Sequence, residues 1–387
     1  MKRVSFVKTP DRIKKQLKRA FVFAIGLRRI LRFAIAVWLV AATSTAFPQA
    51  HSPFEMLDSG FPAEDAFPVA WVDNYRVLFT GVELGTRREH ANQRGYYRGL
   101  KNAAYVWNTA KSVVTKYRDT TLGNLCTKGT YISYRIVESW EAKKIAVFAG
   151  KFGSERRLTL GNTYWFNSIS CRYFADPPVW AKRRMDGRFI QPLIDQDGYI
   201  DYGPSDLRKT SPTEIRNTPP TFWFADGKKS RTLNIEARYR ENRPLRFTYA
   251  PFADEYFARA STSVSSNVEP AFYLSRKGEL RKVDLPKGPW GGWHYFAVRP
   301  GIFVIGGVRR SFSEPGDAGG YLFTKERVTK VVTGNPRQVS VSPDGCKVAF
   351  VYTWSQQAQT DGYEAWKEGK VANTVRMIDL CRPELTR

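Results

Sequence analysis

The architecture is clearest in the stretch Arg337-Gln-Val-Ser-Val-Ser-Pro-Asp-Gly-Cys-Lys-Val-Ala-Phe-Val-Tyr-Thr353. Val339 and Val341 alternate with serines, which is the period-two pattern of a half-buried strand. The Pro-Asp-Gly segment that follows is typical of a tight turn, because proline presets φ, aspartate bonds the backbone and glycine accepts positive φ. A second strand with alternating apolar residues runs to Thr353. We interpret this hairpin as the inner half of a β-propeller blade.

A second kind of hairpin recurs along the chain, with an aromatic-rich strand, a polar turn and a more basic strand. The copies are Ala104–Tyr117, Lys144–Leu158, Phe222–Leu233, Ala271–Leu285 and Gly320–Val332, with a partial copy at Thr374–Leu380. Repeats of about 40–50 residues in four-stranded units indicate a propeller, and these hairpins would be the outer strands of its blades. One longer step, between Lys144 and Phe222, holds either an insertion or an additional degenerate blade. We therefore predict an all-β, single propeller of six blades, with seven as the alternative.

The last blade lacks an outer strand at the C-terminal end of the sequence. An open ring leaves edge strands exposed, so another segment is expected to close it. The natural candidate lies around Leu57–Phe67, in an extended lead-in over residues 47–66 that precedes a propeller over 67–387.

Two segments resemble the WD-repeat-like modules of TolB-type propellers. They are Ser342-Pro-Asp-Gly-Cys-Lys-Val-Ala-Phe350 and Val375-Arg-Met-Ile-Asp-Leu380. The resemblance implies blade architecture and an extracytoplasmic setting. It is confined to this closing blade and implies no partner, and no counterpart of TolB's separate N-terminal α/β domain is seen in the sequence.

Residues 1–46 have the composition of an export signal. Eleven Lys and Arg face the single acid Asp11, and an apolar run, Phe33–Ala42, precedes the small residues Ser44 and Ala46. This run is too short to cross a bilayer, which takes about 20 residues. We expect a signal peptide and a periplasmic or secreted protein of the bacterial envelope. The alternatives are an uncleaved anchor and, because the basic region is long, a translation start near Val22.

Four cysteines suit an exported chain. In an antiparallel strand pair, the start of one strand lies opposite the end of the next. Cys346 begins a predicted strand and Cys381 ends another, so we expect them to form a disulfide. Cys126 and Cys171 would then pair by elimination, although either thiol could be free.

The least ordinary loop is Lys287-Gly-Pro-Trp-Gly-Gly-Trp-His-Tyr-Phe296. Trp290 and Trp293 beside His294 could form a stacking surface for carbohydrate or peptide. The alternative is that one tryptophan caps an interface between blades, since large aromatics usually pack in cores.

Clusters of arginine suggest a second kind of binding surface. The basic clusters are Arg87-Arg88, Arg156-Arg157, Lys182-Arg183-Arg184 and Arg309-Arg310, in a chain of net charge +25. Such clusters with nearby aromatics suit polyanions. Export argues against nucleic acid and favours anionic envelope polymers or lipid head groups. The alternative is a solvated basic face that serves solubility.

Metal binding and catalysis have weak support in the sequence. Asp195-Gln-Asp-Gly198 fails the calcium-loop pattern because its glycine comes too early, and it predicts a hairpin turned by Asp197-Gly198. No common hydrolase, zinc-protease or phosphate-loop motif occurs, and no cofactor is expected.

Three functional hypotheses remain. The first is a non-catalytic, monomeric exported propeller that binds a protein or an anionic envelope polymer through loops on one face. The second is a propeller enzyme that acts on glycans with channel carboxylates, and the third is a structural envelope protein. Two carboxyls within about 10 Å at the channel mouth would favour the enzyme. A basic, aromatic face with few acids would favour binding.

Overall fold

The computed structural model describes residues 54–63, 67–82, 102–128, 130–139, 144–158, 188–193, 198–204, 219–236, 245, 247–259, 268–286, 294–306, 318–354, 365 and 371–382. Predictions for Trp290, Trp293, Arg87, Arg88, Arg183, Arg184 and Cys171, and for the N-terminal signal, lie outside these residues. Within them, no helix is long and apolar enough to cross a membrane.

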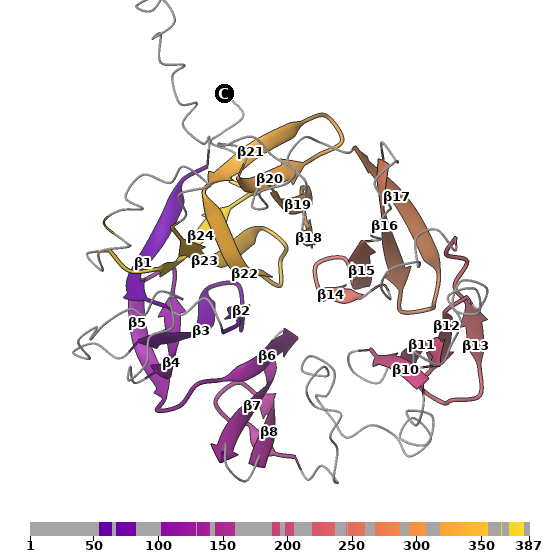
Figure 1. The fold of residues 1–387 in the computed structure, drawn as a ribbon, viewed down its shortest axis with the longest axis horizontal. Coiled ribbons are helices and arrows are strands. Elements are labelled where there is room, and N and C mark those ends of the chain that lie inside the picture. Colours follow the sequence, from indigo (N-terminus) through magenta and orange to yellow (C-terminus); the bar gives the residue numbers. More distant parts are fainter. Residues whose placement is uncertain are drawn as a thin grey trace, which may run out of the picture. The chain divides into compact units, whose positions relative to one another are not determined.

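The chain forms a six-bladed β-propeller of antiparallel four-stranded sheets arranged in a ring (Figure 1). In each of the first five blades, consecutive strands run from the channel to the rim. Blade one contains β2 (Ala70–Trp71), β3 (Arg76–Val82), β4 (Asn102–Asn108) and β5 (Val113–Arg118). Blade two contains β6 (Gly123–Lys128), β7 (Tyr131–Ser139), β8 (Lys144–Lys151) and β9 (Arg156–Arg157). Blade three contains β10 (Arg188–Pro192), β11 (Gly198–Pro204), β12 (Thr221–Phe224) and β13 (Ser230–Thr232).

Blade four contains β14 (Thr248–Ala250), β15 (Glu255–Arg259), β16 (Val268–Ser275) and β17 (Leu280–Pro286). Blade five contains β18 (His294–Val298), β19 (Gly301–Gly306), β20 (Gly319–Phe323) and β21 (Val328–Thr333). Blade six contains β22 (Asn335–Val341), β23 (Lys347–Thr353), β24 (Thr374–Asp379) and, at its rim, β1 (Met56–Pro62).

The repeat analysis is confirmed. Each recurring hairpin forms the two outer strands of one blade, and the partial copy is β24. The long step belongs to blade three, whose strands are preceded by residues 158–187 and interrupted by residues 205–220. The described residues therefore form six blades. The hairpin predicted at Asp197-Gly198 is confirmed by the pairing of β10 with β11, while Asp197 of its turn lies outside the described residues.

The ring closes as expected from the lead-in. β1 pairs antiparallel with β24, with Met56 opposite Ile378 and Pro62 opposite Thr374. Arg376 of β24 supports this pairing, because its Nε lies 2.8 Å from Oδ2 of Asp58 in β1. The last blade thus combines one N-terminal strand with three C-terminal strands, and β24 is no longer an exposed edge.

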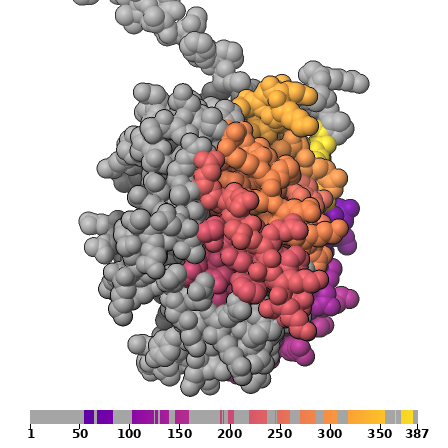
Figure 2. Space-filling view, turned by 90° about the vertical axis from the view of Figure 1, so that its right-hand side faces the viewer, coloured from indigo at the N-terminus to yellow at the C-terminus, as the bar shows by residue number. Residues whose placement is uncertain are grey.

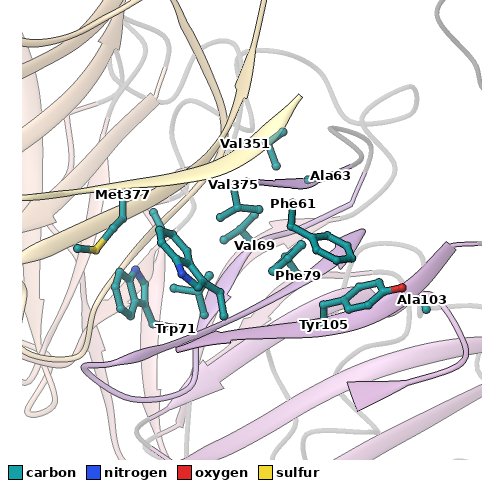
Figure 3. Close-up of a cluster of buried hydrophobic side chains, with 13 residues drawn as sticks. Phe61, Ala63, Val69, Trp71, Phe79, Ala103, Tyr105, Val351, Val375 and Met377 are labelled. Carbon is teal, nitrogen blue, oxygen red and sulfur yellow. The ribbon is translucent and has the colours of Figure 1, made fainter. Parts of the chain in front are cut away.

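Apolar clusters hold neighbouring blades together. Five such clusters join blades six and one, one and two, three and four, four and five, and five and six. In the side view, described residues of blades four and five, red and orange, lie against each other (Figure 2). Phe61 of the closing strand packs with Phe79 and Tyr105 of blade one (Figure 3).

The Ser-Pro-Asp-Gly turn connects β22 and β23 and is fixed from within and from outside. The Asp344 carboxylate accepts a hydrogen bond from the Cys346 backbone N–H at 3.0 Å, and Gly345 has φ +74°. From blade one, the Asn74 side chain accepts from the Asp344 N–H at 3.0 Å. From blade five, the Arg299 Nε donates to the Asp344 carbonyl at 2.8 Å. The turn therefore joins three blades.

The predicted Cys346–Cys381 disulfide is present, with its Cα atoms 5.1 Å apart. It links the start of β23 to the residue that follows β24. Cys126 lies buried in β6, and because Cys171 is not described, the second bridge stays a prediction.

Mass spectrometry of an unreduced digest of exported protein should yield one peptide pair joined through Cys346 and Cys381. Reduction should separate the pair, whereas a Cys381→Ser variant should never produce it. Recovery of both residues as free thiols from exported wild-type protein would contradict the pairing.

Candidate functional site

The two faces of the ring differ in the length of their connections. On one face, the turns joining first to second strands and third to fourth strands contain two to five residues. We call this the turn face. The other face, which we call the loop face, holds the connections from second to third strands and from each outer strand to the next blade. The longest connections, residues 83–101, 158–187, 205–220 and 354–373, all join strand ends on the loop face. Binding residues concentrate on such connections in rigid scaffolds.

The seven residues predicted to bind a partner fall, in the sequence, at or between strand ends of the loop face. Arg87 and Arg88 lie between β3 and β4, and Arg183 and Arg184 lie between blades two and three. Trp290 and Trp293 lie between blades four and five. These six are not described, although the strand ends that flank them are. His294, the seventh, is the first residue of β18 and is exposed on this innermost strand.

The channel wall is free of acids in its strands. The six innermost strands, β2, β6, β10, β14, β18 and β22, surround the centre of the ring (Figure 1). None of them contains an aspartate or a glutamate. They do contain Lys128, Arg188, His294 and Arg337. The described strands that form the wall therefore lack the pair of carboxyls that a glycosidase needs.

Three basic side chains gather on the wall between blades four and six. His294 belongs to β18, Arg337 is exposed on β22, and Arg259 ends β15. The Arg259 guanidinium lies 4.3 Å from the centroid of the Tyr295 ring, so it reaches from blade four onto the inner strand of blade five. We call Arg259, His294 and Arg337 the cationic channel site.

The two arginines of this site disfavour a positive charge on His294. Loss of hydration among the surrounding protein atoms, followed by repulsion from Arg259 and Arg337, lowers the pKa of His294. His294 is itself exposed to solvent, so its loss of hydration comes from nearby protein atoms and not from complete burial. At neutral pH its imidazole is therefore uncharged and can donate one hydrogen bond and accept another. The two guanidinium groups supply the charge and planar donors that suit carboxylate, sulfate or phosphate.

The β22 backbone is irregular beside Arg337. Its register with β23 shifts between Arg337 and Ser340, which is a β-bulge. Gln338 within the bulge has φ +52°, a left-handed conformation that non-glycine residues seldom adopt. Arg337 and Gln338 are both exposed on this innermost strand. Bulges and strained residues of this kind often re-aim side chains at functional sites.

A buried carboxylate between blades one and two escaped the sequence analysis. The Glu155 side chain is 0% exposed and accepts from Tyr117 Oη at 2.5 Å and from an Arg118 guanidinium N–H at 3.0 Å. The Gly153 backbone N–H also donates to it, at 2.6 Å. Burial, aided by Glu155, raises the pKa of Tyr117 to about 12, so its phenol stays protonated. We call this group the Glu155 network. Its partners come from blades one and two, so we interpret it as a structural link between these two blades.

No metal site is evident in the part of the chain that the structure describes, which holds no group of three or more His, Cys, Asp or Glu side chains able to share an ion. Among the predicted arginine clusters, Arg157 forms a surface ion pair with Glu138 at 3.0 Å. Arg156 beside it is exposed.

No family model matches the chain, and no curated protein matches it either. The TolB-type likeness therefore remains a resemblance of the closing blade.

Solved structures give distant matches. An acylaminoacyl peptidase in complex with Z-Gly-Gly-Phe-chloromethyl ketone is 11% identical, with a TM-score of 0.34, and covers 76% of this chain and 43% of that one. This chain thus spans less than half of that protein. The β-propeller domain of the Pyrococcus furiosus trilobed protease is 10% identical, with a TM-score of 0.34, over 76% and 78% of the two chains. XC5397 from Xanthomonas campestris, a gluconolactonase, is 11% identical, with a TM-score of 0.40, over 84% and 89%. The propeller assignment rests on the six sheets themselves.

Proposed function

We propose that this chain is an exported, non-catalytic β-propeller that binds an anionic polymer of the cell envelope through its loop face and the cationic channel site. The observation that carries the proposal is the meeting of Arg259, His294 and Arg337 on a channel wall whose six inner strands hold no acid. A polymer strand with regularly spaced anions could contact this site and the arginine clusters of the loop-face connections at once.

The acid-free inner strands favour binding over glycan hydrolysis. A glycosidase needs two carboxyls about 5–10 Å apart around the bond that it cleaves. Asp201, on the second strand of blade three, is buried and accepts a hydrogen bond from the Gly203 N–H at 2.9 Å. Its carboxylate is thus occupied within its own blade. A polymer-binding role also agrees with the planar, charge-assisted contacts that arginine offers.

Export is part of the proposal and has separate support. The N-terminal segment combines a basic region with a short apolar run, as secretory signals do. The Cys346–Cys381 disulfide is of a kind that persists in oxidising compartments. A periplasmic or secreted protein would meet anionic glycans and lipids before it met nucleic acid.

Arg337→Ala should weaken binding of fluorescein-labelled dextran sulfate about tenfold, as expected for the loss of one charge-assisted hydrogen bond worth ~1.5 kcal/mol. Fluorescence anisotropy at low and high salt measures the change, and uncharged dextran should bind neither protein. Arg327→Ala is the matched control, because Arg327 is an exposed arginine in a turn of blade five on the turn face. Equal losses in the two variants would mean that only net charge matters and would overturn the channel site.

A further inference from the structure

Exposed apolar side chains concentrate on the turn face. The described residues with a large exposed hydrophobic side chain are Met56, Tyr75, Val113, Tyr131, Ile145 and Val328. All except Ile145 lie in a turn of the turn face or begin a strand that leaves it. They belong to blades five, six, one and two, which are consecutive in the ring. Isolated exposed apolar residues need no explanation, but their segregation to one face does.

The three most exposed of these side chains belong to one connected surface of blades one and two. Tyr75 is 59% exposed, Tyr131 52% and Val113 49%. The Tyr75 carbonyl accepts from the Thr109 N–H at 2.8 Å, which places the turn before Val113 beside Tyr75. On the other side, the Phe152 N–H donates to the carbonyl of the residue preceding Tyr131 at 2.7 Å.

An arginine bridges the two blades within this surface. The guanidinium of Arg76, next to Tyr75, lies 4.9 Å from the centroid of the Phe152 ring. From blade six, the Lys347 ammonium lies 5.2 Å from the Tyr75 ring centroid. The turns of blades six, one and two therefore form a continuous aromatic and basic surface, which we call the tyrosine surface.

The charge of the tyrosine surface is positive. Lys111 is exposed in one of these turns, and Lys151 and Arg156 are exposed on the two strand ends that flank another. The acids there are already engaged: Asp73 pairs with Arg76 at 2.7 Å, Asp344 lies 3.8 Å from the Lys347 ammonium, and Glu155 is fully buried in its own network. Apolar and amphipathic side chains with exposed cations around them are the composition of a surface that binds anionic lipid.

The chain also enters the propeller on this face. β24 begins on the loop face and ends on the turn face, and β1 runs antiparallel to it, so Met56 starts β1 at the turn face. Upstream of Met56, residues 1–46 of the sequence carry the apolar run Phe33–Ala42 and ten excess positive charges. A segment with this composition has affinity for an anionic membrane.

We propose that the turn face of blades six, one and two docks on an anionic lipid surface through Tyr75, Val113 and Tyr131 and the cations around them. Tyrosine suits the head-group region because its ring is apolar and its hydroxyl can stay hydrated. This docking would extend membrane contact beyond the N-terminal segment and turn the loop face toward its polymer. A second copy of the chain is disfavoured as occupant, since an isologous contact would bring like charges together.

Hydrogen exchange of the full chain tests this docking, with the protein bound to vesicles of phosphatidylcholine alone or of equal parts phosphatidylcholine and phosphatidylglycerol. We expect the turns at residues 72–76, 109–113 and 128–131 to exchange at least about fivefold more slowly on the anionic vesicles, the factor that ~1 kcal/mol of attraction per basic residue gives. The turn at residues 225–229 of blade three should exchange equally on both vesicles.

Two variants decide the outcome. Tyr75→Ser with Tyr131→Ser should abolish the protection while circular dichroism shows an intact fold, because both side chains are exposed. Ile145→Ser changes the exposed apolar residue outside the turn face and should leave the protection on anionic vesicles unchanged. Equal exchange on the two kinds of vesicle would overturn the proposal, as would protection that persists in the double variant. Protection that appears without anionic lipid and grows with protein concentration would also overturn it, in favour of self-association.

Discussion

Glu155→Gln should lower the free energy of unfolding by about 3 kcal/mol, because removing one partner of a buried ion pair leaves the other charge poorly compensated. In the native protein the carboxylate accepts from Tyr117, Arg118 and the Gly153 N–H, and it joins the outer strand of blade one to a turn of blade two. The neutral amide can accept a hydrogen bond but carries no charge to balance the Arg118 guanidinium, which is 35% exposed and so only partly hydrated. Urea denaturation measures the loss.

The same network predicts how stability depends on acid. Burial alone would raise the pKa of Glu155, but hydrogen bonds from Tyr117, Gly153 and Arg118 outweigh it and the pKa is lowered. A carboxyl with a depressed native pKa stabilises the fold above its unfolded pKa of about 4.3 and loses that contribution as pH falls through the native value. Wild-type stability should therefore fall more steeply below about pH 4.3 than that of Glu155→Gln.

Glu138→Gln is the matched control for this prediction. Glu138 pairs with Arg157 at 3.0 Å in the same blade, but the two side chains are 26% and 53% exposed. An exposed pair of this kind contributes about 0–1 kcal/mol. Equal destabilisation in Glu138→Gln and Glu155→Gln, or parallel pH profiles of Glu155→Gln and wild type, would show that the Glu155 network is not a link between blades.

The architecture was predictable because it depends on local patterns. Alternation in Val339–Val341, the Pro-Asp-Gly turn and the recurring outer hairpins each specify strands over a few residues. Blade number then follows from the repeat length, the closing strand from the need to pair every edge, and the Cys346–Cys381 bridge from the antiparallel pairing of two strands. Each of these expectations is confirmed by the sheet order and the disulfide.

Sites formed between blades were not predictable in this way. Glu155 sits in the polar turn Gly153–Arg156, which in sequence resembles any exposed hairpin turn, and its partners Tyr117 and Arg118 come from another blade. Arg259 and Arg337 likewise meet His294 from different blades. His294 itself was selected for its place beside two tryptophans, whereas the structure groups it with two arginines. Local sequence patterns do not predict such contacts between blades, because these contacts depend on how the blades twist and pack against one another.

Phe61→Ala should destabilise the protein by about 4 kcal/mol, within the range of phenylalanine truncations in cores. Phe61 is only 9% exposed, and its ring centroid lies 4.4 Å from that of Tyr105 and 6.0 Å from that of Phe79 (Figure 3). Gly81 shows how closely the ring fits, since a Cβ at that glycine would lie 2.8 Å from the Phe61 ring. Thermal and urea denaturation measure the loss.

The strands in which hydrogen exchange accelerates show whether Phe61 acts in closing the ring through β1 or only as one more core residue. Phe61 belongs to β1, so loss of its ring should free β1 first and uncover the edge of β24 opposite Met56 and Leu57. Hydrogen exchange in β24 should then accelerate well beyond that in β20, a strand of blade five. Met56→Ala, in the same strand but 37% exposed, should change neither stability nor exchange appreciably. If Phe61→Ala instead accelerates exchange equally in β24 and β20, the ring unfolds as one cooperative unit, and β1 is not the point at which it opens.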